Sequence, residues 1–267
     1  VLHWDFEKGL SDSANGIMCF LKKGAYLEKG KLILQDGGYA VTEKLPFEIS
    51  SKSLAARVRL DNLEQRGGGV ISIQSPNGAV FDSIVFAEKE PRKWIAGSNG
   101  FRRTQSFGGA PFEKEADRNF VHLTVTYGGD GTITAYRNGE PYGKSYSTGS
   151  HLYKRDDCIV SFGVRHLPAN PQRLLVGRID EASLYDFELT AEDILLISNP
   201  DTFVDQKQLY ESLPSKLQRT YSKLTEKKSA LEKEIRRMRK NMAVSDKPEL
   251  QDLALALFNM KEFIYLK

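Results

Sequence analysis

The residues best suited to ligand binding lie in segment 88–112, which mixes aromatic, arginine and amide side chains. Aromatic faces pack against the C–H surfaces of sugars, and planar polar groups hydrogen-bond sugar hydroxyls. An alternative interpretation places Trp94 and Phe101 in the core, on two strands that flank a turn at 97–100, whereas arginines are harder to bury. The predicted ligand site consists of Trp94, Asn99, Phe101, Arg102, Arg103 and Gln105.

Carboxylates could supply a different chemistry, because two of them facing one cleft can hydrolyse a glycosidic bond. In a strand only positions i and i+2 share a face. Glu113, Glu115 and Asp117 have this spacing, but their segment is charged and lacks residues that favour strands. Asp180 and Glu181 are adjacent, so in a regular strand they would face opposite sides. The sequence therefore predicts no catalytic pair, and we expect a protein that is not an enzyme.

Histidines and cysteines show no spacing typical of a metal or nucleophile site. Gly67-Gly68-Gly69 precedes a strand pattern, so it is not a phosphate-binding loop. Cys19 and Cys158 both lie in apparent strands, which leaves open two buried thiols or one disulfide. The four histidines are scattered along the chain: His3, His122, His151 and His166.

Residues 1 to about 187 have the pattern of short strands separated by turns. The clearest part is 120–146, where strand 120–127, a glycine-rich turn and strand 132–137 are followed by Asn138-Gly139, a strong hairpin signal. A third strand is expected through Tyr142 and Tyr146. No helical period is visible before residue 190. The sequence therefore predicts a mainly β fold, an antiparallel two-sheet jelly-roll sandwich.

The pattern changes after the strands. Thr190 to Asp193 has the form of a capping box before a short helix, which Asn199-Pro200 would end. Residues 203–267 are predicted to form an α-helical hairpin packed on itself, on the sandwich or on a partner. The predicted domains are 1–198 and 199–267. The heptad pattern is carried by Leu217, Tyr221, Leu224, Leu231, Ile235, Met238 and Met242.

Charge is distributed unevenly along the chain. The net charge is +3, but segment 205–247 carries an excess of six positive charges and the remainder is net −3. The basic run 234–240 is typical of the solvated face of a heptad helix. Anionic polysaccharide or an acidic partner are alternatives, but without interleaved aromatic residues no nucleic-acid partner is expected.

Three segments resemble a laminin-G-like domain, which has the concanavalin-type jelly roll. They are 3–7 with Asp12, 130–139, and 177–194, in the order that this family has them. Segments 94–105 and 253–265 further resemble the version found in planctomycete-type secreted proteins, beside cytochrome-c-like domains. The resemblance covers about 1–198 and implies an extracytoplasmic part of a larger multidomain protein. The haem-attachment motif Cys-x-x-Cys-His is absent from the sequence.

The same resemblance implies a calcium ion, because laminin-G-like domains often hold one near the rim. Calcium prefers carboxylate and carbonyl oxygens. The expected ligand is Asp180, with Asp5 or Asp12 as partners. Alternatively, Asp180 caps a turn or pairs with Arg178.

These observations predict a non-catalytic binding module that recognises carbohydrate or a protein surface. The alternatives are a purely structural or docking domain and, on weaker grounds, a glycoside hydrolase. No stretch approaches the roughly 20 apolar residues of a transmembrane helix.

Overall fold

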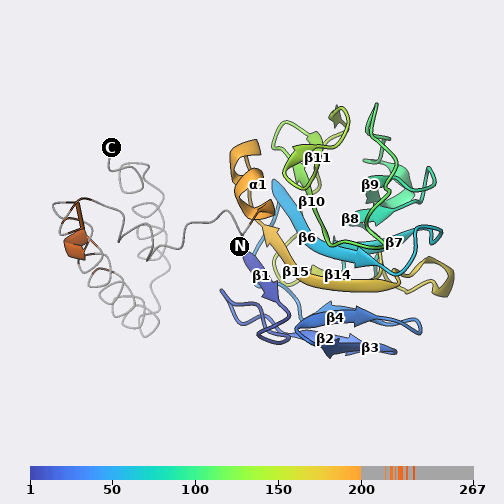
Figure 1. Ribbon diagram of the computed structural model, residues 1–267, viewed down its shortest axis with the longest axis horizontal. Coiled ribbons are helices and arrows are strands. Elements are labelled where there is room, and N and C mark those ends of the chain that lie inside the picture. Colours follow the sequence, from blue (N-terminus) through green and yellow to red (C-terminus); the bar gives the residue numbers. More distant parts are fainter. Residues whose placement is uncertain are drawn as a thin grey trace. The chain divides into compact units, whose positions relative to one another are not determined.

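The computed structural model describes residues 1–199 and, further along, positions 214, 217, 218, 220, 222–224, 227 and 231. The chain divides into two compact units, Val1–Phe203 and Val204–Lys267. In its described part, the first unit is a sandwich of two antiparallel sheets, with nine and six strands (Figure 1). This confirms the predicted mainly β, jelly-roll-like fold.

The nine-stranded sheet contains most of the polar surface discussed below. Its main path runs β12-β11-β10-β6-β15-β4-β3, while β1 pairs with β15 and β13 with β11. The strands are β1 (Leu2–Asp5), β3 (Ala25–Glu28), β4 (Lys31–Leu34), β6 (Lys52–Leu60), β10 (Val121–Tyr127), β11 (Thr132–Arg137), β12 (Glu140–Pro141), β13 (Tyr146–Ser147) and β15 (Gly177–Tyr185).

The six-stranded sheet has the order β2-β5-β14-β7-β8-β9. Its strands are β2 (Cys19–Lys22), β5 (Tyr39–Thr42), β7 (Gly68–Gln74), β8 (Phe81–Phe86), β9 (Trp94–Ser98) and β14 (Ile159–Phe162). Cys19 and Cys158 are free, buried thiols, so the disulfide alternative is wrong. Burial raises the pKa of Cys19 to about 12 and that of Cys158 to about 11.

The core lies between the sheets and follows the two-residue period of the strands. On β6, Leu54 and Val58 belong to the core cluster, whereas Arg57 lies on the opposite, outer face. Aromatic side chains join the layers: the rings of Trp4 and Phe162 meet edge to face with centroids 5.2 Å apart. The outer face of the nine-stranded sheet is therefore free to carry polar side chains.

One irregularity interrupts this period in β15. The pairing with β6 shifts between Ile179 and Glu181, which lie opposite the consecutive residues Val58 and Arg57. Asp180 is thus an extra residue in a β-bulge. The bulge changes which side chains of β15 reach the outer face.

The predicted β10–β11 region is mostly confirmed. Asn138 and Gly139 form the turn between β11 and β12, with φ angles of 51° and 85°, the left-handed values that a two-residue hairpin turn requires. The expected third strand is instead two short ones, β12 and β13. Tyr142 lies between them, and its hydroxyl donates to the carbonyl of Pro111 at 2.7 Å.

Helix α1 (Ala191–Ser198) follows β15 and lies beside β10 (Figure 1). The predicted capping box is present, since the side chains and backbones of Thr190 and Asp193 bond reciprocally. The predicted hairpin lies largely outside the described residues. Within the described positions of the second unit, Leu217, Leu224 and Leu231 are helical.

Candidate functional site

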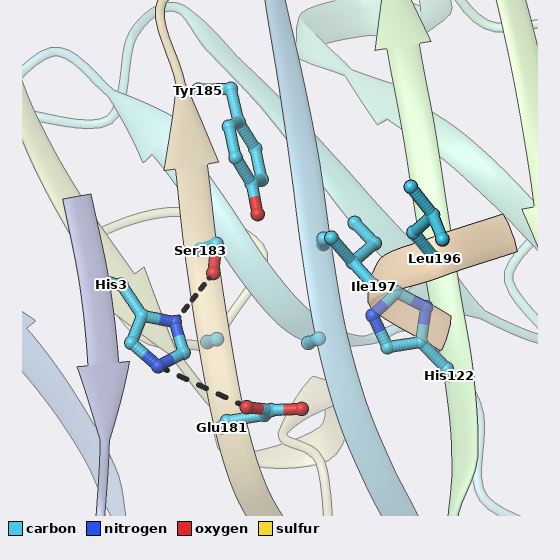
Figure 2. A pocket seen from close by; sticks show the side chains of 10 residues that line it. His3, His122, Glu181, Ser183, Tyr185, Leu196 and Ile197 are labelled. Carbon is cyan, nitrogen blue, oxygen red and sulfur yellow. Dashed lines mark hydrogen bonds and ion pairs between the residues drawn. The ribbon is translucent and has the colours of Figure 1, made fainter. Parts of the chain in front are cut away.

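A pocket of about 200 Å³ lies on the outer face of the nine-stranded sheet, beside α1. Figure 2 shows His3 from β1 next to Ser183 and Glu181 from β15, and Leu196 and Ile197 from α1 on the far side. The pocket is lined by His3, Ala55, Ala56, His122, Glu181, Ala182, Ser183, Tyr185, Leu196 and Ile197.

Three polar side chains from the two ends of the domain meet in this pocket. β1 pairs with β15, which places His3 opposite Ser183. His3 Nδ1 lies 2.8 Å from Ser183 Oγ, and His3 Nε2 lies 3.9 Å from Glu181 Oε2 (Figure 2). The imidazole is thereby held between a hydroxyl and a carboxylate, both of which can also bond to a ligand.

The bulge in β15 places a second carboxylate beside Glu181 on the outer face. Because Asp180 is the extra residue, Asp180 and Glu181 both reach the outer face, where Asp180 contacts Lys31 and Arg57 while Glu181 approaches His3. The expectation that these adjacent carboxylates face opposite sides is therefore wrong. It assumed a regular strand, and the bulge removes the alternation at this point.

Burial raises the pKa of Glu181, and the negative charge of Asp180 raises it further. His3 and Arg57 act in the opposite direction but do not overcome burial. Glu181 therefore takes up a proton more readily than an exposed carboxylate does. In its protonated form it donates a hydrogen bond, and in its ionised form it accepts one.

His122 joins the sheet to the helical wall of the pocket. Its Nδ1 lies 2.8 Å from Ser198 Oγ in α1. Burial and the positive charge of Arg57 lower the pKa of His122 to about 4. The imidazole is therefore neutral at pH 7, with one ring nitrogen bonded to the last residue of the helix.

The arrangement suits binding better than nucleophilic catalysis. A serine nucleophile needs a base oriented by an acid within hydrogen-bond distance. Here the histidine–carboxylate distance of 3.9 Å exceeds that limit. β15 also lies between β1 and β6, so the backbone around Ser183 is engaged in sheet pairing on both sides.

Comparison with known proteins identifies the family. A family model described as concanavalin A-like lectin/glucanases superfamily, of the laminin G type, matches residues 34–195, more than half of the chain. The chain belongs to this superfamily. No curated protein shows significant sequence similarity to it.

Several solved structures share the concanavalin A-like fold. Domain 4 of AbnA, a GH43 extracellular arabinanase from Geobacillus stearothermophilus solved with arabinotriose, is 17% identical with a TM-score of 0.57; the match covers 74% of this chain and 97% of that one. The receptor-binding domain of botulinum neurotoxin type G is 13% identical with a TM-score of 0.50, covering 75% of this chain and 51% of that one. At these identities the similarity shows the fold alone.

In this concanavalin A-like domain, two of the six predicted ligand residues are buried. Trp94 is 3% exposed, and its Nε1 donates to Glu113 Oε2 at 2.8 Å. Trp94 is thus a core residue, as the alternative interpretation proposed. Phe101, which that interpretation also placed in the core, is 47% exposed.

The expectation that the arginines lie at the surface is wrong for Arg103, which is 8% exposed. Its Nε lies 2.9 Å from Asp82 Oδ1, and Lys52 Nζ lies 3.0 Å from the other carboxylate oxygen of Asp82. A fully buried carboxylate needs such partners, because an unpaired buried charge is costly. Arg103 is therefore held inside by Asp82.

The remaining predicted ligand residues surround this internal cluster and do not line the pocket. Asn99 Oδ1 accepts a hydrogen bond from Arg103 at 3.2 Å. Phe101, Arg102 and Gln105 are exposed, and Lys89 Nζ lies 5.9 Å from the Phe101 ring centroid. The site predicted in segment 88–112 is thus divided between the core and the surface.

The three predicted calcium ligands each have other partners. Asp5 pairs with Lys8, and Asp180 pairs with Lys31 and Arg57 but not with Arg178, which contacts Asp61. Asp12 accepts backbone N–H bonds from His3, Ala14, Asn15 and Ile17. Within the described ranges, no three His, Cys, Asp or Glu side chains are grouped to hold a metal.

Calcium binding stays a prediction with a direct test. Calcium that binds only the folded state raises the melting temperature. A rise of several degrees in millimolar calcium, lost in the Asp180→Asn variant, would support the site. An unchanged melting temperature would rule out the calcium site.

Glu113 has a structural role. Arg137 donates to both of its carboxylate oxygens at 2.9 Å. Burial alone would raise the pKa of Glu113, but the bonds from Arg137 and Trp94 and from backbone N–H groups lower it to about 2. Glu115 lies on the exposed side of the same arginine.

Sequence reasoning missed the pocket residues because pairing between distant strands brings them together. His3 and Ser183 are 180 positions apart. The available signal was the matching strand patterns at the two ends of the domain. No helix in the part of the chain that the structure describes has the length and apolarity to span a bilayer.

Proposed function

We propose that this domain is a non-catalytic carbohydrate-binding module and that its outer-face pocket receives one unit of the glycan. One observation carries the proposal: His3, Ser183 and Glu181 converge beside Tyr185 over a floor that contains alanines. Hydroxyl, imidazole and carboxylate groups match sugar hydroxyls, and small residues leave room for a ring.

The size of the pocket supports this assignment. Its volume of about 200 Å³ is below the roughly 300–1,000 Å³ of sites that enclose drug-sized ligands. It suits a single small group of a ligand whose remainder lies on the open sheet. The fold adds support by analogy, since the arabinanase domain that shares it was solved with arabinotriose.

A glycoside hydrolase is the second candidate, favoured by the bulge that brings Asp180 and Glu181 to one face. The raised pKa of Glu181 is the property of a general acid. Against this role, Asp180 already pairs with Lys31 and Arg57. A purely structural or docking domain is the third candidate.

The proposed setting follows from the family resemblance. We place the domain outside the cytoplasm, secreted, periplasmic or on the cell surface, as one part of a larger multidomain protein. A protein surface is the alternative ligand in this setting, and the other domains of the parent protein are further partners.

A glycan array tests the function, using the full chain with calcium and again with a chelator. We expect defined glycans to bind, and Glu181→Gln and His3→Ala to weaken binding at least tenfold. Glu140→Gln, an exposed carboxylate on β12, is the matched control and should bind as the unmodified chain does.

The other outcomes separate the candidates. Binding that follows calcium would point to the rim near Asp180. Release of reducing sugar that Glu181→Gln abolishes would make the domain a hydrolase. If the folded chain binds no glycan either with calcium or with chelator, a docking role becomes the better assignment.

A further inference from the structure

Two arginines face each other on the same outer surface. Arg59 of β6 lies directly opposite Arg178 of β15 in the strand register. Both side chains are partly exposed. Like charges directly opposite each other destabilise a sheet. Asp61 offsets this repulsion on the Arg178 side, whereas Arg59 has no carboxylate partner among the described residues, so an anion from outside would stabilise the pair.

An aromatic ring lies beside this pair. Phe120 immediately precedes β10, and the guanidinium carbons of Arg57 and Arg59 are each 5.8 Å from its ring centroid. Lys31 Nζ is 6.0 Å from the same centroid. Three cations from two strands thus surround one ring, within or near the range of cation–π attraction.

The carboxylates nearby do not neutralise these cations. Asp180 pairs with both Lys31 and Arg57, and Asp61 pairs with Arg178. Among the described residues, no carboxylate lies within 4 Å of Arg59. Four cations therefore have two carboxylates at ion-pair distance, and Glu181 acts on Arg57 from farther away, which leaves Arg59 as the cation without an acidic partner among the described residues.

Hydrogen bonding at the pair is also incomplete. The Nε atoms of Arg59 and Arg178 are both buried and have no hydrogen-bond partner. A buried donor without a partner is costly, and native proteins contain few of them. The two facing arginines thus keep hydrogen-bonding capacity that no described residue uses.

We propose that Arg59 and Arg178, with Lys31, Arg57 and Phe120, bind an acidic polysaccharide through its sulfate or carboxylate groups. Neighbouring strands lie about 4.8 Å apart, so one oxyanion can reach both guanidinium groups. The sugar ring that carries the anion packs against Phe120.

The position of the pair favours a polysaccharide over other polyanions. Arg57 lies opposite Glu181 of the pocket, and Arg59 follows two residues later, roughly 7 Å along the strand. That length is close to one unit of an extended glycan. One chain can therefore place a sugar in the pocket and its charged neighbour on the arginines. The choice of a sugar ligand rests on the proposed function, whereas the anion site does not.

The test measures binding of the full chain to four probes: heparin for sulfate, polygalacturonate for carboxylate, neutral arabinan, and duplex DNA. We expect at least one acidic polysaccharide to bind tenfold or more tightly than arabinan, with an affinity that falls as salt rises. Arg59→Met and Arg178→Met should each reduce this affinity at least tenfold. Arg155→Met, at an exposed arginine outside this group of cations, is the matched control and should remain within twofold.

A second measurement separates binding from folding. Arg59→Met removes a like-charge contact and breaks no ion pair, so its melting temperature without ligand should equal or exceed that of the unmodified chain, whereas Arg178→Met also loses the partly exposed pair with Asp61 and should stay within a few degrees. Unchanged affinity in both variants would overturn the inference, as would equal binding of DNA and acidic polysaccharide. Glycan binding that depends on Glu181 but shows no acidic preference would overturn this inference and leave the proposed function standing.

Discussion

Glu113 illustrates, at the scale of a single residue, how a carboxylate spaced like a catalytic group can serve the fold. Its side chain is 0% exposed, and that of Arg137 is 21% exposed. The bidentate bond between them joins segment 113–117 to β11. The pair's contribution is therefore measurable in stability, not in activity.

Glu113→Gln should lower the free energy of unfolding by about 3 kcal/mol, because it leaves Arg137 without its buried partner. Urea denaturation measures this change. Glu115→Gln, whose side chain is 54% exposed, is the control and should change stability by less than about 1 kcal/mol. Equal effects of the two variants would contradict the structural role of Glu113.

The Glu113 pair also predicts a pH dependence. The pKa of this carboxyl is depressed to about 2 in the folded state, from 4.5. Its contribution is fully present above about pH 4.5 and is lost as the pH falls through 2. The difference in stability between the unmodified chain and Glu113→Gln should therefore shrink between pH 5 and pH 2. A constant difference across that window would show that the carboxyl titrates normally.

The burial or exposure of single side chains was the feature hardest to predict from the sequence. Phe101 and Arg102 are exposed and Trp94 is buried, although all three lie in one segment of similar composition. Arg103 is buried because Asp82 of β8 pairs with it, and sequence alone does not indicate that partner. Burial of a charged residue depends on a partner brought near by the fold.

At the scale of elements, α1 forms one wall of the pocket and is attached to β10 through His122 and Ser198. The pKa of His122 is about 4 in the folded state, below its ordinary value of 6.5. The folded protein therefore protonates this histidine only at a lower pH. The unfolded chain therefore takes up the proton first as the pH falls. Acid should loosen this attachment.

We expect stability to fall between pH 6.5 and pH 4, with His122 accounting for about 2 kcal/mol at pH 5. Thermal melting at pH 7.5 and pH 5 measures the loss. In His122→Gln the loss should be smaller by that amount, whereas His151→Gln, whose ring packs edge to face against Tyr153, should retain most of it. Identical pH profiles for His122→Gln and the unmodified chain would contradict the assignment.

The capping box gives a second prediction for α1. Thr190→Ala removes the acceptor for the backbone N–H of Asp193 and should cost about 1 kcal/mol. Chemical denaturation measures it, and Thr190→Ser should retain most of the stability. A neutral Thr190→Ala would mean that packing alone holds the helix.

Strands and helices were more predictable than the positions of single side chains, wherever the sequence signal lay within a few consecutive residues. β11 has the predicted limits, and the capping box was identified from four consecutive residues. The bulge at Asp180 was not predicted, because it is defined by the partner strand β6, more than 100 residues earlier. The pocket was not predictable either, because it needs the pairing of β1 with β15, which brings together residues 180 positions apart.

At the scale of the whole molecule, strand periodicity predicts the sandwich, and the family match agrees with it. In the second unit, the structure describes a few positions of the predicted heptad helix. Leu217, Leu224 and Leu231 recur every seven residues, are helical, and are 51%, 53% and 50% exposed. A heptad seam is stabilised when a partner covers it.

We therefore expect the full chain to self-associate with rising concentration. Analytical ultracentrifugation from about 1 to 100 µM measures the mass. Leu224→Glu should shift the equilibrium to monomer, while Lys223→Glu, at an exposed neighbouring position, should have little effect. A monomer at every concentration would show that the seam is covered within one chain.

The extra residue in β15 also bears on how such a site could arise. Ile179 and Glu181 already pair with consecutive residues of β6. Removing Asp180 alone would therefore leave those partners matched and the rest of the ladder undisturbed. Insertion of a single codon is therefore enough to place two neighbouring carboxylates on one face of the sheet. An insertion of this size adds chemistry to a surface without redesigning the core beneath it.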